Sequence, residues 1–371
     1  MNSVERDAVI KKLGEASYSE VFLQTPTDCE QDPIVLKIIP FGKEEQCEIS
    51  QIIQEVRITK AMGEIEGYIG FRGAYVTRGF FPNILIDEWD LYDEEYGSEN
   101  ERPDFYDEDQ LFAIIMLEMG GSDLEHTDLN GWEDAFDVFF QTAVALARGE
   151  KRRQFEHRDL HFGNIVIRRK PQALPTRKKP RTPTSGESDP SALLENLSLN
   201  TPSAPRESNL KVAMIDYTLS RAHCGPSSNT SEFIEFAPLD DPALFTGKGN
   251  YQFDIYRFMK NHVTSLAPCA PDGSDGSEES IEWNVFAPMT NVFWLHYLTD
   301  ILMNKKGIPR PAARGRFKTS EEERDFYRKV ETVGRRINPR KKMLDPGKEI
   351  GSAVELVEWA VKEGLFPEVE I

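Results

Sequence analysis

Apolar residues alternate with polar ones, or run together in short β-branched stretches, along the first third of the chain. The first stretch has a turn-rich middle between two apolar flanks and reads AVIKKLGEASYSEVFLQT. It is followed by PIVLKIIPF, an apolar run around one lysine, and later by QLFAIIMLEMGG, an apolar run that ends in a Gly-Gly turn. Short apolar runs bounded by turn residues are typical of strands. The pattern therefore predicts a β-sheet in the N-terminal part.

Helical periodicity follows the first strands and dominates the second half of the chain. Apolar residues first recur at helical spacing at four positions: Ile49, Ile52, Ile53 and Val56. A longer helix is predicted from Trp132 to Arg148. It leads into a loop and strand that read FEHRDLHFGNIVI, and a second short strand with its loop reads KVAMIDYTLSRA. Near the C-terminus, NVFWLHYLTDILM and IGSAVELVEWAVKEGLF have apolar faces suited to a helical core.

Two segments break the pattern. Residues 87–109 carry twelve acidic side chains against one arginine, and we expect a loop or insertion there. Residues of about 170–210 are rich in Pro, Ser, Thr and basic side chains, and cannot bury enough apolar surface to offset the entropy of ordering. We expect a disordered insert within the domain. Its RKKPR run at 177–181 is a candidate nuclear-import signal, and Thr182 and Thr201 each precede a proline.

Composition narrows the class of protein. A length of 371 residues suits one large two-lobed domain or two ordinary ones. The net charge of −19 disfavours binding to a DNA backbone and favours a basic protein or peptide partner. The four cysteines form no CxxC pair or zinc-spaced cluster, which fits a reduced cytosolic or nuclear compartment. We find no apolar signal core and no membrane-spanning run.

The loop at 155–167 is the strongest candidate for chemistry. Asp159 and Asn164 stand five residues apart just before a strand, and Asp216 ends a later apolar strand. Phosphoryl transfer needs such a set: Asp159 as base or hydroxyl-orienting carboxylate, and Asn164 and Asp216 as ligands of Mg²⁺. We expect His157 and Arg158 to support the loop. An Asp and an Asn can also cap turns, but the pair beside two apolar strands favours the catalytic interpretation.

The N-terminal part offers the remaining pieces of a phosphate site. LGEASYSEV, from Leu13 to Val21, lies where a phosphate-covering loop of pattern G-x-G-x-x-G-x-V belongs. Gly14 and Val21 match, whereas Ala16 and Ser19 replace the other two glycines, which reduces the flexibility of the loop.

A lysine in a buried strand needs an oppositely charged partner. Lys37 lies in the apolar run IVLKII, and the following helix offers Glu55. A strand lysine paired with a helix glutamate is the ion pair that grips ATP phosphates in kinases.

His161 stands two residues after Asp159, where protein kinases usually have lysine. Histidine is mostly neutral at pH 7, so it supplies less charge. It can donate a hydrogen bond to phosphate or orient Asp159, and we count it with Lys37 and Glu55 in the catalytic set. The same DLH-x-GN arrangement occurs in phosphotransferases that resemble aminoglycoside kinases. A small-molecule kinase therefore stays a competing hypothesis.

Four stretches make the chain similar to the haspin family of atypical serine/threonine protein kinases. They read LEMGGSDLE at 117–125, FEHRDLHFGN at 155–164, IDYTLSR at 215–221 and LFTGKGNYQFDIYRFMK at 244–260, with a weaker match in NVFWLHYLTD at 291–300. The family replaces the usual DFG by DYT, here Asp216, Tyr217 and Thr218, and lacks an APE motif, as this chain does.

This resemblance implies an α+β, two-lobed protein-kinase-like fold. A small β-rich N-lobe would cover residues 1–119, with the acidic insertion at about 87–109, and a larger helical C-lobe would cover residues 120–371. The family's roles transfer to the matching ATP-site positions: Leu117 as gatekeeper, Glu118, Met119 and Gly120 as the hinge against adenine, and Asp123 at the ribose. Asp254 would be the buried aspartate that braces the catalytic loop.

The resemblance also implies a substrate and a setting. The family phosphorylates a threonine near the start of the core histone tail that begins Ala-Arg-Thr-Lys, during mitosis. We therefore expect ATP and Mg²⁺ as cofactors, a basic histone tail as substrate, indirect contact with chromatin, and no membrane or sequence-specific nucleic acid. We expect a monomer in the nucleus and on chromosomes, with the cytoplasm as a second location. The missing glycines leave a catalytically weak pseudokinase, used as a binding module, as an alternative.

The segment after Asp216 bears on regulation. Many kinases wait for a phosphate there that pairs with the catalytic-loop arginine, here Arg158. Thr218 in place of the DFG glycine restricts the backbone. Six apolar residues are expected to pack the segment permanently: Phe233, Ile234, Phe236, Leu239, Leu244 and Phe245. We therefore predict a kinase that needs no activating phosphate.

Overall fold

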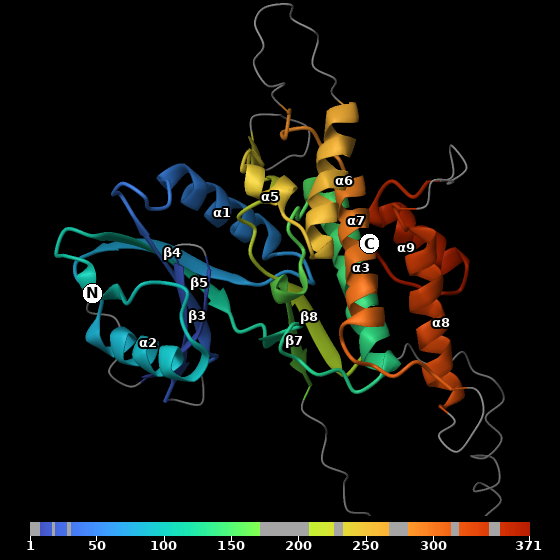
Figure 1. Cartoon of the computed structure of the whole chain (residues 1–371), viewed down its shortest axis with the longest axis horizontal. Helices are drawn as coiled ribbons and strands as arrows, with labels where there is room; N and C mark the ends of the chain where they lie inside the picture. Colours follow the sequence, from blue (N-terminus) through green and yellow to red (C-terminus); the bar gives the residue numbers. More distant parts are fainter. Residues whose placement is uncertain are drawn as a thin grey trace, which may run out of the picture.

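The structure is a computed structural model in which the strands gather on one side and most helices on the other (Figure 1). It describes eight ranges: 8–16, 19–27, 31–170, 208–225, 233–266, 281–312, 319–340 and 349–371. The division into a β-rich N-terminal part and a helical C-terminal part confirms the predicted α+β, protein-kinase-like fold.

A five-stranded antiparallel sheet forms the N-terminal part, in the order β1-β2-β3-β5-β4. Its strands are β1 Ala8–Ala16, β2 Ser19–Pro26, β3 Ile34–Phe41, β4 Phe71–Arg78 and β5 Leu111–Glu118. The central strands β3 and β5 are the β-branched runs of the sequence, and their alternate side chains fill apolar clusters on both faces of the sheet. Lys37 lies in the middle of β3, opposite Val21 of β2 and Ile115 of β5.

Smaller sheets carry the loops of the candidate site. β6 Ser122–Asp123, β7 Ile165–Arg169 and β8 Leu210–Met214 form a three-stranded sheet. β9 Arg221–His223 and β10 Ile234–Phe236 pair in a second antiparallel unit. The short 3-10 turn η2 Phe162–Asn164 leads directly into β7.

The helices supply the larger core. Their bounds are α1 Ile49–Met62, α2 Asn83–Tyr96, α3 Trp132–Arg153, α5 Pro242–Thr246, α6 Tyr251–Leu266, α7 Met289–Asn304, α8 Glu321–Arg336 and α9 Ala353–Lys362. Helix α3 packs against α7, α8 and α9, and α6 packs against α7 (Figure 1). Helix α3 runs five residues beyond its predicted end, and three basic side chains in its last turn complement the helix dipole.

Residues 87–96 of the acidic tract belong to the helix α2, so a loop is the wrong prediction for them. That the tract is an insertion stays a prediction. The acidic side chains of α2 point outward. Its short apolar face, made of Leu85, Ile86 and Trp89, is buried against the protein. A further turn, η1 Pro103–Phe105, follows in the same tract. Burial of one apolar stripe stabilises a helix even where charge dominates its composition.

The insert falls mostly outside the described residues. These omit residues 171–207, and with them the RKKPR run, Thr182 and Thr201. Its two ends are neighbours: the Lys170 amide donates to the carbonyl of Asn209 at 2.8 Å, one step beyond the β7–β8 pairing. Within the described ranges no helix combines the length and the apolar character that a bilayer crossing needs.

Candidate active site

The Lys37–Glu55 pair forms as predicted. Lys37 Nζ lies 2.6 Å from Glu55 Oε1, which the inward face of α1 presents to the sheet, and 3.8 Å from Asp216 Oδ2. Burial alone would lower the pKa of Lys37, but the carboxylates of Asp216 and Glu55 raise it. The ammonium group of Lys37 therefore lies between Glu55 of α1 and Asp216, which follows the strand β8.

Asp216 is held in a left-handed backbone conformation, with φ of 60°. Its Oδ1 accepts hydrogen bonds from the amide and the hydroxyl of Thr218, and the Thr218 carbonyl accepts from Gln54 of α1. Burial would raise the pKa of Asp216, but Lys37 and the Thr218 hydrogen bonds lower it to about 2. Asp216 is therefore ionised at neutral pH, and the DYT segment is tied to α1.

Asp159 is held by a residue that the sequence did not single out. Tyr256 of α6 donates its hydroxyl to Asp159 Oδ1 at 2.6 Å, and Asn164 Nδ2 donates to the Asp159 carbonyl at 2.9 Å. Burial raises the pKa of Asp159 to about 8, against the opposing effect of the Tyr256 hydrogen bond. The helical period of YQFDIYR could have identified Tyr256, because it lies on the buried face of the helix, one residue after the fully buried Ile255.

Asn164 and Asp216 fit a magnesium ion. The Ile215 amide donates to the Asn164 carbonyl at 3.0 Å, which puts the two segments side by side. Because Asn164 Nδ2 is committed to Asp159, its amide oxygen is the group left for a ligand, next to an ionised carboxylate. Mg²⁺ takes oxygen ligands and keeps several waters, so one or two protein ligands suffice beside phosphates. The described ranges contain no cluster of three or more acidic, histidine or cysteine ligands.

His161 caps the N-terminal end of the turn η2. Its Nδ1 accepts a hydrogen bond from the Gly163 amide at 3.1 Å, so the proton of the neutral ring lies on Nε2. Burial lowers the pKa of His161, although the nearby carboxylates of Asp216, Glu125 and Asp123 raise it. The ring can therefore donate one hydrogen bond from Nε2, and it brings no full positive charge at neutral pH.

The predicted phosphate cover is the hairpin β1–β2. Gly14 pairs with Val21 next to a register shift, and Ala16 pairs with Ser19 as the last described rung. Ala16 and Ser19, which replace glycines, thus continue a strand ladder toward the tip. Leu13 is exposed to 39% on the same strand.

The predicted hinge connects β5 to β6. Glu118 ends β5, where its amide donates to the Gly70 carbonyl and its carboxylate pairs with Arg72. Gly121 has φ of 112°, and a Cβ there would lie 2.1 Å from the Ile167 carbonyl oxygen, so only glycine fits. Asp123 in β6 accepts from the His126 amide. The adenine and ribose roles of Leu117, Glu118, Met119, Gly120 and Asp123 stay predictions.

The expectation that Asp254 braces the catalytic loop from a buried position is wrong. Its side chain is 36% exposed and pairs with Arg257 and Arg340 at the start of α6. The bracing residue is Asn291 of α7, which is fully buried. Its Oδ1 accepts from the His157 amide at 3.1 Å, and its Nδ2 donates to the Phe155 carbonyl at 2.9 Å.

Arg158 supports the loop from within the core. It is fully buried, donates to Glu156 and to the Trp283 carbonyl, and lies over the Trp283 ring. Arg221 shares this environment: it donates to the Gln154 carbonyl and lies 3.8 Å from Glu156. The prediction that His157 and Arg158 support the loop agrees with these contacts.

Four of the six apolar residues expected to pack the segment after Asp216 do so, whereas Ile234 is only partly buried and lies outside the core clusters of the described residues. Leu239 is buried, and Phe236, Leu244 and Phe245 pack against the main core. Phe233 differs, since 42% of it is exposed, with its ring against His223. Glu235 of β10 pairs with Arg57 of α1 at 2.6 Å, so the segment also fastens the helix that carries Glu55.

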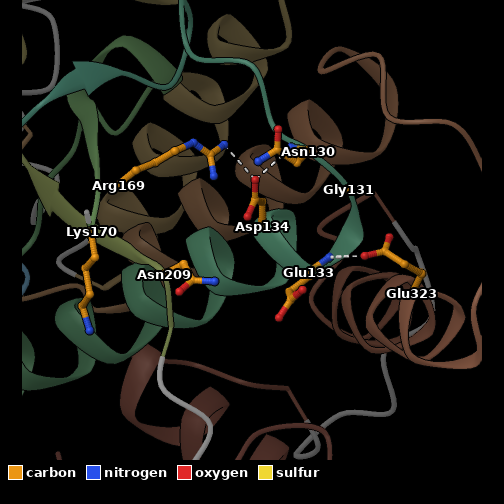
Figure 2. A pocket seen from close by; sticks show the side chains of 8 residues that line it. All are labelled: Asn130, Gly131, Glu133, Asp134, Arg169, Lys170, Asn209 and Glu323. Carbon is orange, nitrogen blue, oxygen red and sulfur yellow. Dashed lines mark hydrogen bonds and ion pairs between the residues drawn. The ribbon is translucent and has the colours of Figure 1, made fainter. Parts of the chain in front are cut away.

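A hollow of about 350 Å³ lies where the N-terminal end of α3 meets β7 (Figure 2). It is lined by Asn130, Gly131, Glu133, Asp134, Arg169, Lys170, Asn209 and Glu323, and by none of the predicted site residues. Arg169 points to Asp134, and Glu323 accepts from the Trp132 and Glu133 amides at the start of α3. These charged residues of the hollow are therefore paired within the protein and stabilise the start of α3.

Comparison with known proteins agrees with this geometry. Residues 2–355 match the family described as "Haspin like kinase domain". The chain is 34% identical to the serine/threonine-protein kinase haspin homolog hrk1 of Schizosaccharomyces pombe, over 94% of this chain and 67% of that protein. It is 34% identical to the mouse serine/threonine-protein kinase haspin, over 82% of this chain and 37% of that one. It is 33% identical to the serine/threonine-protein kinase haspin homolog of Drosophila melanogaster, over 78% of this chain and 47% of that protein. The chain thus spans less than half the length of these two animal relatives.

Proposed function

Since the chain belongs to the haspin-like kinase family, we propose that it is a serine/threonine protein kinase that uses ATP to phosphorylate a threonine in a basic histone tail during mitosis. One observation supports this most: Lys37, Glu55 and Asp216 form one charged cluster, and Asn164 links the segment of Asp216 to the Asp159 loop. These are the groups that position ATP and a hydroxyl in phosphoryl transfer.

Each residue has a definite task in this mechanism. Lys37 neutralises charge on the ATP phosphates, and Glu55 holds the Lys37 ammonium in place. Asp159 receives the hydrogen bond of the attacking hydroxyl on the carboxylate oxygen that Tyr256 leaves free. Burial raises the pKa of Asp159, so its ionised form holds a proton taken from the hydroxyl more tightly than an exposed aspartate would. The Nε2 hydrogen of His161 is available to a phosphate oxygen.

Asn164 and Asp216 are the residues that would hold Mg²⁺. When bound, the ion screens the negative charge of the phosphates. The amide oxygen and the carboxylate are already oriented by the hydrogen bonds to Asp159 and Thr218.

Electrostatics favour a basic substrate. The chain carries a net charge of −19, and Asp123 and Glu125 act electrostatically on His161, beside the catalytic loop. Carboxylates at that place attract lysines, arginines and a free amino terminus, and the attraction weakens as salt rises. Histone tails have this chemistry. A location in the nucleus and on chromosomes, with some protein in the cytoplasm, goes with such a substrate.

The function is tested with radiolabelled ATP and a mixture of core histones, followed by mass spectrometry of the labelled protein. We expect label on one threonine near a histone amino terminus, and loss of that label with Asp159→Asn. The rate on the matching peptide should fall with added salt and with acetylation of its amino terminus. Equal label with the parent and Asp159→Asn would favour the pseudokinase alternative. A preference for an aminoglycoside over every basic peptide would favour a small-molecule kinase.

A further inference from the structure

The acidic tract contacts the phosphate-covering hairpin. Helix α2 packs on β1, and the residues after α2 form hydrogen bonds with side chains of both hairpin strands. A buried lysine stands at the centre of this contact. Lys12 of β1 is 2% exposed, its Nζ lies 2.9 Å from Glu15 Oε2 and 2.6 Å from Glu20 Oε2, and it lies over the rings of Trp89 and Tyr92.

The residues after α2 complete the same cluster. The Ser98 hydroxyl and the Glu99 amide donate to the two carboxylate oxygens of Glu15, both at 2.6 Å. Asn100 Nδ2 donates to Glu20 Oε1 at 3.0 Å and approaches the Ser19 carbonyl at 3.4 Å. We call these three residues, Ser98, Glu99 and Asn100, the latch. The latch therefore grips one carboxylate on each strand of the hairpin.

The grip lies at functional positions of the hairpin. Glu15 stands between Gly14 and Ala16, and it pairs with Glu20 in the β1–β2 ladder. Glu20 follows Ser19, the second glycine replacement. In a glycine-rich loop the backbone is free to open, and ordering it over ATP has an entropic cost. Here the two replacements form one rung of the hairpin and the latch holds the adjacent rung, so both restrict the hairpin before nucleotide binds.

Resting on the proposed function, we propose that the latch positions the hairpin for ATP, so that Ser98 and Asn100 set the affinity for nucleotide without touching it. A preordered hairpin binds nucleotide with a smaller entropic loss than a mobile one. The acidic tract would then compensate for the missing glycines by holding the hairpin in its binding conformation. The latch residues are positioning residues in this account.

The test is the double variant Ser98→Ala/Asn100→Ala, compared with the parent as full chains. We expect the KM for ATP and the Kd for ADP to rise about fivefold, with kcat changed by less than about twofold, because the catalytic groups are untouched. Amide hydrogen exchange in nucleotide-free protein should become faster in Ala8–Ala16 and Ser19–Pro26. A purely structural role would lower the thermal midpoint and leave the KM and the Kd unchanged.

Arg102→Ala is the matched control, because the Arg102 ion pairs in this tract go to Asp90 and Asp104 instead of to the hairpin. It should leave the KM, the Kd and the exchange rates as in the parent. A folded double variant whose nucleotide affinity and hairpin exchange stay within about twofold of the parent overturns the proposal. If the double variant does not fold, Ser98→Ala alone is measured in the same way, and the same outcomes decide.

The two proposals fail in different ways. A parent that binds ADP but labels no protein would contradict the proposed function and leave the latch to be decided by ADP affinity. A parent that binds no nucleotide would contradict both.

Discussion

Arg158 donates from Nε and Nη2 to the carboxylate of Glu156, two residues earlier in the chain, at 3.2 and 3.3 Å. Both side chains are fully buried. In many kinases the corresponding arginine binds an activating phosphate. Here an internal carboxylate already pairs with that guanidinium, and the Trp283 carbonyl accepts from it as well. A phosphate on the surface could not reach it without opening the core.

The first prediction follows from this pairing. Protein made in bacteria and treated with phosphatase should phosphorylate a histone tail peptide as fast as untreated protein, because no phosphate is needed to order the loop. The measurement is the initial rate before and after treatment. A tenfold loss that incubation with ATP restores would show that a phosphate is required.

The second prediction concerns stability. Glu156→Gln should lower the free energy of unfolding by roughly 3–5 kcal/mol, since it leaves the buried charges of Arg158 and Arg221 without their carboxylate. Asp254→Asn is the matched control at an exposed pair, where a loss below about 1 kcal/mol is expected. Urea titration of both variants measures the difference. Similar midpoints for the two would mean that Glu156 does not stabilise the core.

The third prediction concerns pH. Glu150 is buried and accepts hydrogen bonds from Asn291 and from the Ala353 and Val354 amides. Burial raises the pKa of Glu150 to about 7, above its ordinary value of 4.5. The folded state therefore binds more protons than the unfolded state between those values, and stability falls as the pH rises through that window. This contribution is fully present below 4.5 and lost above 7.

Glu150→Gln should be less stable than the parent, because its amide cannot accept from every donor. The difference between the two should shrink from pH 5 to pH 7, by up to about 1.4 kcal/mol per pH unit. Chemical unfolding at several pH values measures it. A difference that grows with pH would contradict the assigned direction.

The fourth prediction concerns the insert. Its ends are joined by the hydrogen bond from Lys170 to Asn209 and by the β7–β8 ladder, so the strands need no long connection. Replacing residues 172–207 with a short Gly/Ser linker should leave peptide phosphorylation nearly unchanged, because loop closure changes by only about 0.6 kcal/mol per doubling of length. The replacement keeps Ser208, which donates to Asp137. A fall in thermal midpoint comparable to that of a core mutation would show that the segment stabilises the fold.

Short sequence motifs predict the charged residues of the site. They do not predict the residues that hold those groups in place. The sequence predicts Lys37, Asp159 and Asp216 because phosphoryl transfer needs those groups beside apolar strands. The structure brings them near Glu55 and Asn164. The supports Tyr256 and Asn291 act from helices far along the chain, and only tertiary packing brings them to the loop.

Two errors have the same physical origin. The acidic residues of α2 outnumber those of its short apolar stripe, so the sequence pattern predicts a loop where a helix forms. The motif position of Asp254 predicts a buried side chain, whereas its helix turns it toward Arg257 and Arg340. In both cases the burial of neighbouring side chains, which the sequence does not reveal directly, decided the outcome.

The measurement that tests the central claim most directly compares the parent with Asp159→Asn for both phosphate transfer and ADP binding in one preparation. Asp159 acts on the hydroxyl and not on the nucleotide, so we predict that the variant loses transfer from radiolabelled ATP to the histone tail peptide by at least about 1,000-fold, while its Kd for ADP stays within about twofold. Transfer by Asp159→Asn at a rate similar to that of the parent would contradict the account.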